Sequence, residues 1–131
     1  MKKLLLILVI PFFYSCGKLT IDKPLEKLYD SFIVDMYDMD RNPIQLCNLI
    51  MTDELEYIKL GRSYTAKATV IINKKRWKGL SSIEKKIIVY HELGHCMLGL
   101  KHTEKGGIMN AYPLRYTDKI TEEDFKNLFT N

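Results

Sequence analysis

One long buried helix, expected over residues 81–98, is the feature that most constrains how this chain can fold. Ser81 and Glu84 form a capping-box pattern, in which the two side chains bond the free N–H groups at a helix start. From Ile87 to Leu98 the helix is apolar almost all round. Gly99 then offers a stop, because glycine adopts the left-handed conformation without penalty. We expect a helix of this kind to be buried, with the rest of the chain packed around it.

The polar positions of this helix form the pattern H-E-x-x-H, with histidines at 91 and 95 and a glutamate at 92. Residues four apart share a helix face, so His91 and His95 can hold one zinc ion. Glu92 can reach a zinc-bound water without ligating the metal, as a general base of hydrolysis does. The third and last histidine of the sequence is His102. A turn at Gly99 would bring it back toward the other two as a third ligand.

The segment resembles the metzincin clan of zinc endopeptidases, whose signature is H-E-x-x-H-x-x-G-x-x-H followed by a Met-turn. Residues 106–110 (G-G-I-M-N) are similar to that turn, and the resemblance covers residues 69–113. It implies that Met109 forms an apolar floor beneath the zinc. It also implies a peptide or protein substrate and makes Tyr112 a candidate transition-state stabiliser, although Tyr112 lies one position further on than the clan pattern has it.

The chain departs from the clan signature at one point, which leaves the third ligand open. Three residues separate His95 from Gly99, where the signature has two. If the helix is one residue longer, the chain can still turn at Gly99 and place His102 beside the other two histidines. The alternative third ligand is a downstream carboxylate, for which the candidates are Asp118, Glu122 and Glu123. We favour His102, because histidine is a common zinc ligand and a glycine turn precedes it.

The N-terminus has the layout of a secretory signal, with a basic tip followed by an apolar run over residues 4–14. Ser-Cys-Gly follows at residues 15–17 and resembles a bacterial lipobox. That resemblance implies a signal peptide at 1–15, a lipidated Cys16 and a protein anchored to the membrane of the bacterial cell envelope. The alternative is ordinary signal cleavage with an unmodified cysteine. We expect a tether over residues 16–24 and a single domain over residues 25–131.

The remaining elements predict an α+β fold. Apolar residues recur at helical spacing between Leu25 and Met36, and a short helix is expected to start near Thr121. Residues 68–73 are the clearest strand, residues 44–52 are a second, and residues 53–67 are a loop or an irregular strand. The resemblance implies a small metzincin-like domain, with a twisted, mainly antiparallel or mixed sheet packed on the long active-site helix and a further helix at each end.

Net charge and cysteine content indicate which partners and which state of the cysteines to expect. The formal charge is +4, and loss of Lys2 and Lys3 with the signal leaves +2. That excess is small and dispersed, so we expect no nucleic-acid partner. We also expect a monomer. Cys47 and Cys96 would form a disulfide in an oxidising compartment or remain two buried thiols. The basic run at residues 74–78 is either a membrane or acidic-substrate contact or, as we favour, a solvated turn with Trp77 packed on the helix start.

These features predict a zinc endopeptidase, and two other functions remain open. One is a non-catalytic envelope lipoprotein that binds zinc structurally. The other is a metallohydrolase acting on something other than peptides.

Overall fold

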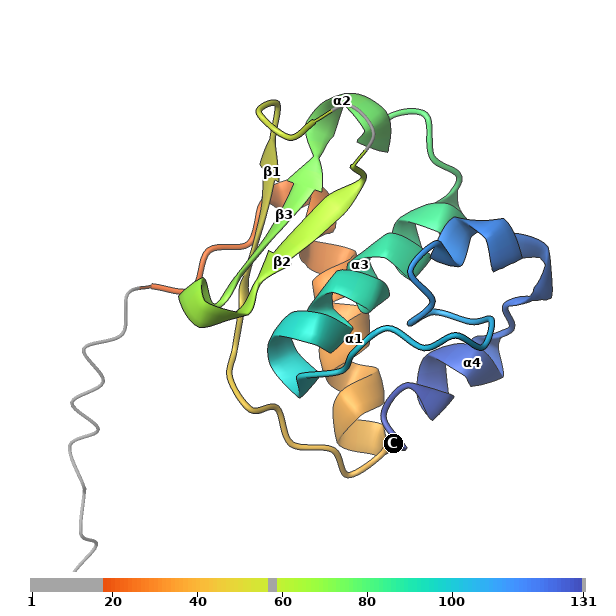
Figure 1. The fold of residues 1–131 in the computed structure, drawn as a ribbon. Coiled ribbons are helices and arrows are strands. Elements are labelled where there is room, and N and C mark those ends of the chain that lie inside the picture. Colours follow the sequence, from red (N-terminus) through yellow and green to blue (C-terminus); the bar gives the residue numbers. More distant parts are fainter. Residues whose placement is uncertain (1–17, 57–58, 131) are drawn as a thin grey trace, which may run out of the picture.

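The chain forms an α+β fold, as predicted, in which a small mixed sheet packs against one long helix (Figure 1). The structure is a computed structural model that describes residues 18–56 and 59–130. The long helix is α3 (Ser82–Leu98), and it lies between the sheet and the C-terminal third of the chain. Helix α1 (Glu26–Asp38) runs behind α3 in the view of Figure 1. Helix α4 (Glu122–Asn127) lies near the C-terminus and packs against α1. The central position of α3 is what places its polar residues inside the molecule.

The sheet has the order β1-β3-β2. Strand β3 (Thr69–Asn73) pairs in parallel with β1 (Asn48–Thr52) and antiparallel with β2 (Gly61–Tyr64). The β-branched residues of β3 suit its central place, because such side chains pack well on a pleated, buried surface. The strand predicted at residues 68–73 is therefore confirmed. The segment predicted as loop or irregular strand contains β2, which forms one edge of the sheet.

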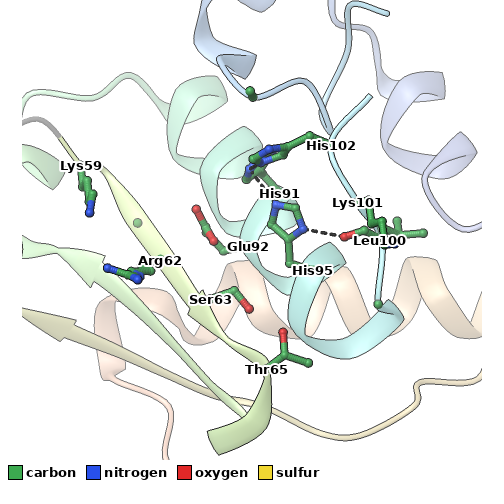
Figure 2. A pocket seen from close by; sticks show the side chains of 13 residues that line it. Lys59, Arg62, Ser63, Thr65, His91, Glu92, His95, Leu100, Lys101 and His102 are labelled. Atoms are coloured by element: carbon green, nitrogen blue, oxygen red, sulfur yellow. Dashed lines mark hydrogen bonds between the residues drawn. The ribbon is translucent and has the colours of Figure 1, made fainter. Parts of the chain in front are cut away.

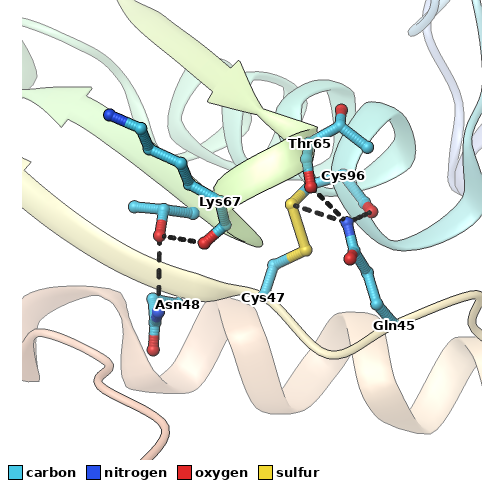
Figure 3. The surroundings of a disulfide bond; sticks show 7 residues. Gln45, Cys47, Asn48, Thr65, Lys67 and Cys96 are labelled. Atoms are coloured by element: carbon cyan, nitrogen blue, oxygen red, sulfur yellow. Dashed lines mark hydrogen bonds between the residues drawn. A yellow bond between two sulfur atoms is a disulfide. The ribbon is translucent and has the colours of Figure 1, made fainter. Parts of the chain in front are cut away.

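The strand expected over residues 44–52 is shorter than predicted, because residues 44–47 bind the end of α3 instead of extending the sheet. The backbone N–H of Ile44 donates to Met97 O at 2.8 Å, and Gln45 Nε2 donates to Cys96 O at 3.0 Å. Gln45 Nε2 also donates to Thr65 O at 2.8 Å, in the short helix η2 (Thr65–Lys67). Cys47 and Cys96 form a disulfide beside these contacts (Figure 3). The C-terminal end of α3 is thereby fixed to the segment that precedes β1, and Gln45 joins that segment to η2.

The capping predicted for α3 is present at both ends. Ser81 Oγ accepts from the backbone N–H of Glu84, whose carboxylate accepts from the N–H of Ser81. Gly99 adopts φ +66°, the left-handed conformation that ends the helix. The predicted terminal helices are present as well. Helices α1, α3 and α4 are joined by edge-to-face aromatic contacts whose ring centroids are 5.0–5.2 Å apart. The rings are those of Phe32 in α1, Tyr90 in α3, Phe125 in α4 and Phe129 just after α4.

The basic run at residues 74–78 forms a short helix, α2 (Lys74–Trp77), rather than the turn expected. Trp77 is buried, and Lys85 Nζ from the first turns of α3 lies 5.3 Å from its ring centroid. The packing of Trp77 on the helix start is therefore confirmed. The remaining short helices are η1 (Lys23–Leu25) and η3 (Pro113–Lys119).

The expected tether is shorter than residues 16–24, because the chain joins the domain earlier. Leu49 N donates to Thr20 O and Asp22 N donates to Leu49 O, both at 2.9 Å, so this segment covers the outer edge of β1. Asp22 Oδ2 also accepts from Met51 N at 2.6 Å. The predicted signal peptide and Cys16 lie outside the described residues. Within the described ranges, no helix has the length and apolar character needed to cross a bilayer.

Candidate metal centre

The three histidines of the chain converge at the surface of α3 next to the sheet (Figure 2). His91 Nε2 lies 3.2 Å from His95 Nε2 and 3.2 Å from His102 Nε2. The ring centroids of His95 and His102 are 4.7 Å apart. His91 is buried, His95 is half-buried and His102 is exposed, so the cluster opens to solvent on one side. This arrangement can hold one metal ion.

The outer ring nitrogens of the two helical histidines are bound to backbone carbonyls. His91 Nδ1 contacts Ile108 O at 2.6 Å, and His95 Nδ1 contacts Leu100 O at 2.5 Å. A carbonyl oxygen only accepts, so each Nδ1 must carry the proton. In a neutral ring the Nε2 atom then carries a free lone pair. Outer partners of this kind orient metal-binding imidazoles in proteins.

The protonation of the rings tests whether a cation fits here. Burial lowers the pKa of His91 to about 4, and it also lowers the pKa of His95. Both rings are therefore neutral near pH 7, and neither Nε2 has a proton to donate to the other. Zinc at about 2.0–2.1 Å from tetrahedral ligands separates those ligands by about 3.3 Å. The 3.2 Å Nε2 separations match that spacing. A cation at this point would accept the lone pairs of these nitrogens.

The structure favours His102 over the downstream carboxylates as the third ligand. Helix α3 extends to Leu98 and so absorbs the extra residue before Gly99. Leu100 N then donates to Gly94 O at 3.1 Å, which folds the chain back over the helix. Among the described residues, Asp118, Glu122 and Glu123 are not part of the cluster. Glu122 pairs instead with Lys86 at 2.9 Å.

The loop between His102 and Asn110 is closed by the side chain of Asn110, which the sequence analysis did not single out. Asn110 Nδ2 donates to Thr103 O at 3.3 Å and to Lys105 O at 3.2 Å. Thr103 N also donates to Met109 O at 2.9 Å. A buried asparagine that bonds two carbonyls of one loop holds that loop in a single shape. It thereby positions both His102 and the carbonyl of Ile108.

Met109 packs directly against the helix segment between the first two histidines. A Cβ placed on Gly94 would lie 2.9 Å from Met109 Sδ, so only glycine leaves room for this contact. Met109 is 7 % exposed. Gly94 is therefore a site residue that the sequence pattern alone did not indicate, because its neighbour comes from a loop 15 residues further along the chain.

Glu92 lies between the histidines and strand β2 (Figure 2). Its carboxyl group is buried, which raises its pKa to about 7, and a backbone hydrogen bond from Ser63 opposes that shift. A divalent cation at the histidines would also favour the charged carboxylate. Gly61 leaves the space that the side chain fills, since a Cβ there would lie 3.0 Å from Glu92 Cγ. Residues 61 and 63 of β2 thus shape the surroundings of Glu92, and the sequence did not indicate either.

Strand β2 borders a cavity of about 660 Å³ that contains the three histidines and Glu92. In the pairing of β2 with β3, Asn73 N donates to Leu60 O. Along an edge strand, successive residues point their backbone N–H and C=O groups alternately toward the paired strand and away from it. The backbone groups of residues 60, 62 and 64 therefore point toward β3, and those of Gly61 and Ser63 point toward the cavity. Among the described residues no further strand pairs with this edge of β2, and the backbone N–H of Ser63 donates to Glu92 instead.

Tyr112 lines the cavity next to the one that holds all three histidines, and shares that second cavity with His91 and Glu92. It is 62 % exposed and is not among the described residues that line the histidine cavity. Its ring contacts the guanidinium of Arg115, 4.4 Å from ring centroid to Cζ, and borders a neighbouring cavity. The role of transition-state stabiliser gains no support from this position.

Comparison of the chain with known protein families, with curated proteins and with solved structures gave no match. The site is therefore defined by its own geometry. It consists of three imidazoles that could hold one metal ion, with a buried carboxylate beside them and the edge strand β2 along the cavity.

Proposed function

We propose that this protein is a zinc-dependent endopeptidase of metzincin type. The observation that carries the proposal is the convergence of three imidazole Nε2 atoms beside the buried carboxylate of Glu92. Metal-assisted hydrolysis needs these two parts together, a Lewis acid and a base within reach of the same water.

Zinc suits this site better than the hard cations. Imidazole nitrogen is a preferred ligand for zinc, whereas calcium and magnesium take oxygen ligands. Structural zinc sites close with four protein ligands, and catalytic sites use three and leave one position open. The cluster among the described residues has three. This count favours a catalytic centre over the alternative of a non-catalytic zinc-binding lipoprotein.

The chemistry divides between the metal and Glu92. Zinc, when bound, polarises a carbonyl group and makes water acidic enough to act as a nucleophile near neutral pH. Glu92 accepts the proton of the attacking water at a carboxylate oxygen as the water oxygen adds to the carbonyl carbon. The C–N bond then breaks, and Glu92 returns the proton to the leaving amine. The carbonyls of Ile108 and Leu100 hold two of the ligand rings in place throughout.

The free edge of β2 favours a peptide as substrate over other hydrolysable groups. An extended peptide can add to an exposed strand edge through main-chain hydrogen bonds. The outward backbone groups of Gly61 and the carbonyl of Ser63 would align such a peptide along the strand against which Glu92 packs, while the N–H of Ser63 bonds Glu92. Hydrolysis of an internal bond follows, because a strand edge binds chain on both sides of the scissile bond.

The disulfide supports the proposed location in the cell envelope. Disulfides persist in exported proteins and are rare in the cytosol. We therefore propose an exported protein whose first residue after cleavage is a lipidated Cys16. The domain begins near Thr20, so the lipid anchor would hold it close to the membrane surface.

Metal analysis of His102→Ala tests the ligand set. Wild-type protein is expected to retain one zinc per chain after dialysis, and the variant is expected to lose it. Removing a direct ligand costs more than the roughly 10–100-fold in affinity that loss of an outer partner costs. The measurement is zinc content by mass spectrometry, with Lys101→Ala as the control, because Lys101 is exposed beside the ligand.

A His102→Ala variant that keeps its zinc would show that another residue completes the site. Wild-type protein that binds zinc and cleaves no member of a generic peptide library would support the non-catalytic alternative. Wild-type protein without zinc would remove both metal-based functions.

Replacing Gly61 with alanine is expected to slow hydrolysis severalfold without loss of zinc. The new Cβ would lie 3.0 Å from Glu92 Cγ and 3.3 Å from Glu92 Oε1, so the carboxylate must move. The shift needed is a few tenths of an ångström, so the expected loss is well below the roughly 10²-fold that a displacement of about 1 Å can cost. Gly79→Ala is the matched control, because its nearest neighbour, Arg76 O, is 3.7 Å away. Equal kcat values for the two variants would mean that the position of Glu92 does not limit the reaction.

A further inference from the structure

A second cavity, of about 500 Å³, adjoins the metal centre and shares Gly61, His91 and Glu92 with the first. Its other walls come from residues 59–60, from α2, from α3 and from residues 111–115. Its apolar lining consists of Leu60, Ile88, Pro113 and Leu114, together with the ring of Tyr112. A cavity in this place would receive the substrate side chain next to the bond that is cut.

The charged side chains around the two cavities are almost all basic. Lys59, Arg62 and Lys101 line the first cavity, and Lys59, Arg76 and Arg115 line the second. Glu92 is the one acidic residue among the described residues that line either cavity. A cleft lined by one sign of charge concentrates ligands of the opposite sign. The negative charge of Glu92 itself would be offset by a divalent cation at the histidines.

Arg115 is the basic residue best placed to select a ligand in the second cavity. It is exposed, and its guanidinium Cζ lies 4.4 Å from the ring centroid of Tyr112, which is part of the same wall. A cation held against an aromatic face keeps its orientation. A guanidinium has donors in a fixed fork that matches the two oxygens of a carboxylate. Lys59 contributes less, because Glu56 lies 3.6 Å from its amino group.

We propose that the second cavity binds an acidic side chain adjacent to the scissile bond, so that the protein cleaves acidic peptide segments. This inference rests on the proposed peptidase function and names its substrate class. The apolar walls cover the methylene groups of a glutamate, and Arg115 at the wall formed with Tyr112 binds its carboxylate. The sequence raised an acidic-substrate contact only for the basic run at residues 74–78, to which Arg76 belongs, and a solvated turn was favoured there. The other basic residues of the cleft come from separate segments, so the sequence did not group them.

The test uses internally quenched peptides that carry either glutamate or glutamine at each position flanking the scissile bond, in an alanine background. Wild-type protein is expected to cleave the glutamate peptide with a kcat/KM about tenfold higher than its glutamine counterpart, in the range of a charged hydrogen bond. In Arg115→Gln the ratio should fall to about 1, and Arg115→Lys should restore part of it. Lys27→Gln, on the exposed face of α1, is the control and should leave the ratio unchanged.

A binding measurement separates recognition from turnover. With the Glu92→Gln variant loaded with zinc, fluorescence anisotropy of the same two labelled peptides should show the same preference, and the preference should weaken with salt. Equal kcat/KM values for the two wild-type substrates would overturn the acidic preference and leave the peptidase function standing. A preference that survives Arg115→Gln would overturn the role of Arg115. Cleavage of none of the peptides, with zinc bound, would overturn both proposals.

Discussion

Glu92→Gln is expected to reduce peptide hydrolysis by about 10³-fold while the zinc content stays at one per chain. Glutamine has nearly the shape of glutamate but does not accept a proton from water, so the loss falls on proton transfer, which contributes about 10²–10⁴-fold. The three ligand nitrogens are supplied by His91, His95 and His102, so their geometry does not depend on the carboxylate. Zinc content and kcat/KM on one peptide, measured on the same preparation, check this result.

Glu123→Gln is the matched control for this prediction. Glu123 is exposed on α4 and lines neither of the two cavities. It was also one of the carboxylates considered as a third ligand, so unchanged zinc content in this variant tests that alternative at the same time. Cleavage by Glu92→Gln at the wild-type rate would mean that Glu92 is not the general base.

Replacing both cysteines of the disulfide with alanine is expected to lower the free energy of unfolding by about 4 kcal/mol. The bond joins residues 49 apart, and in the chain-entropy model a loop of that size loses about this much constraint in the unfolded state. Cys47 and Cys96 are both fully buried, so the smaller side chains also leave unfilled space in the core. Urea unfolding monitored by the fluorescence of Trp77 measures the change.

Reduction provides the control for the disulfide prediction. A reducing agent should lower the midpoint of wild-type unfolding and leave that of the double-alanine variant unchanged. If reduction has no effect on the wild-type protein, the two cysteines are free thiols. The double-alanine variant should also bind zinc somewhat more weakly than the wild-type protein. Cys96 is the residue after His95, and its carbonyl accepts from Gln45, so loosening the end of α3 would loosen the position of His95.

Much of the candidate site was predictable because His91, Glu92 and His95 lie on one helix. The spacing of His91 and His95 needs only helical geometry, and Ser81, Glu84 and Gly99 mark where that helix begins and ends. The hydrogen-bond partners of the Nδ1 atoms were not predictable. They are backbone carbonyls, that of Ile108 for His91 and that of Leu100 for His95. Every residue has a backbone carbonyl, so the amino-acid sequence does not indicate which carbonyl will accept a hydrogen bond.

The fold was predictable to a similar degree. The central strand β3 and the helices α1, α3 and α4 follow from local apolar spacing and capping. The edge strand β2 was left as a loop or an irregular strand, because its residues G-R-S-Y carry no strand-like alternation and are held by pairing with β3. The strand expected from residue 44 was too long, because hydrogen bonds and a disulfide to α3 engage residues 44–47 instead.

The sequence by itself determined the buried helix, its caps and the shared face of His91 and His95, because these depend on interactions within a few residues. Only the tertiary structure decided that His102 joins them, that β2 stands beside Glu92, and that basic residues from separate segments surround the cleft. The physical reason is that these arrangements depend on how the loops close and the core packs. Such contacts join residues far apart in the chain, and no local pattern encodes their distance.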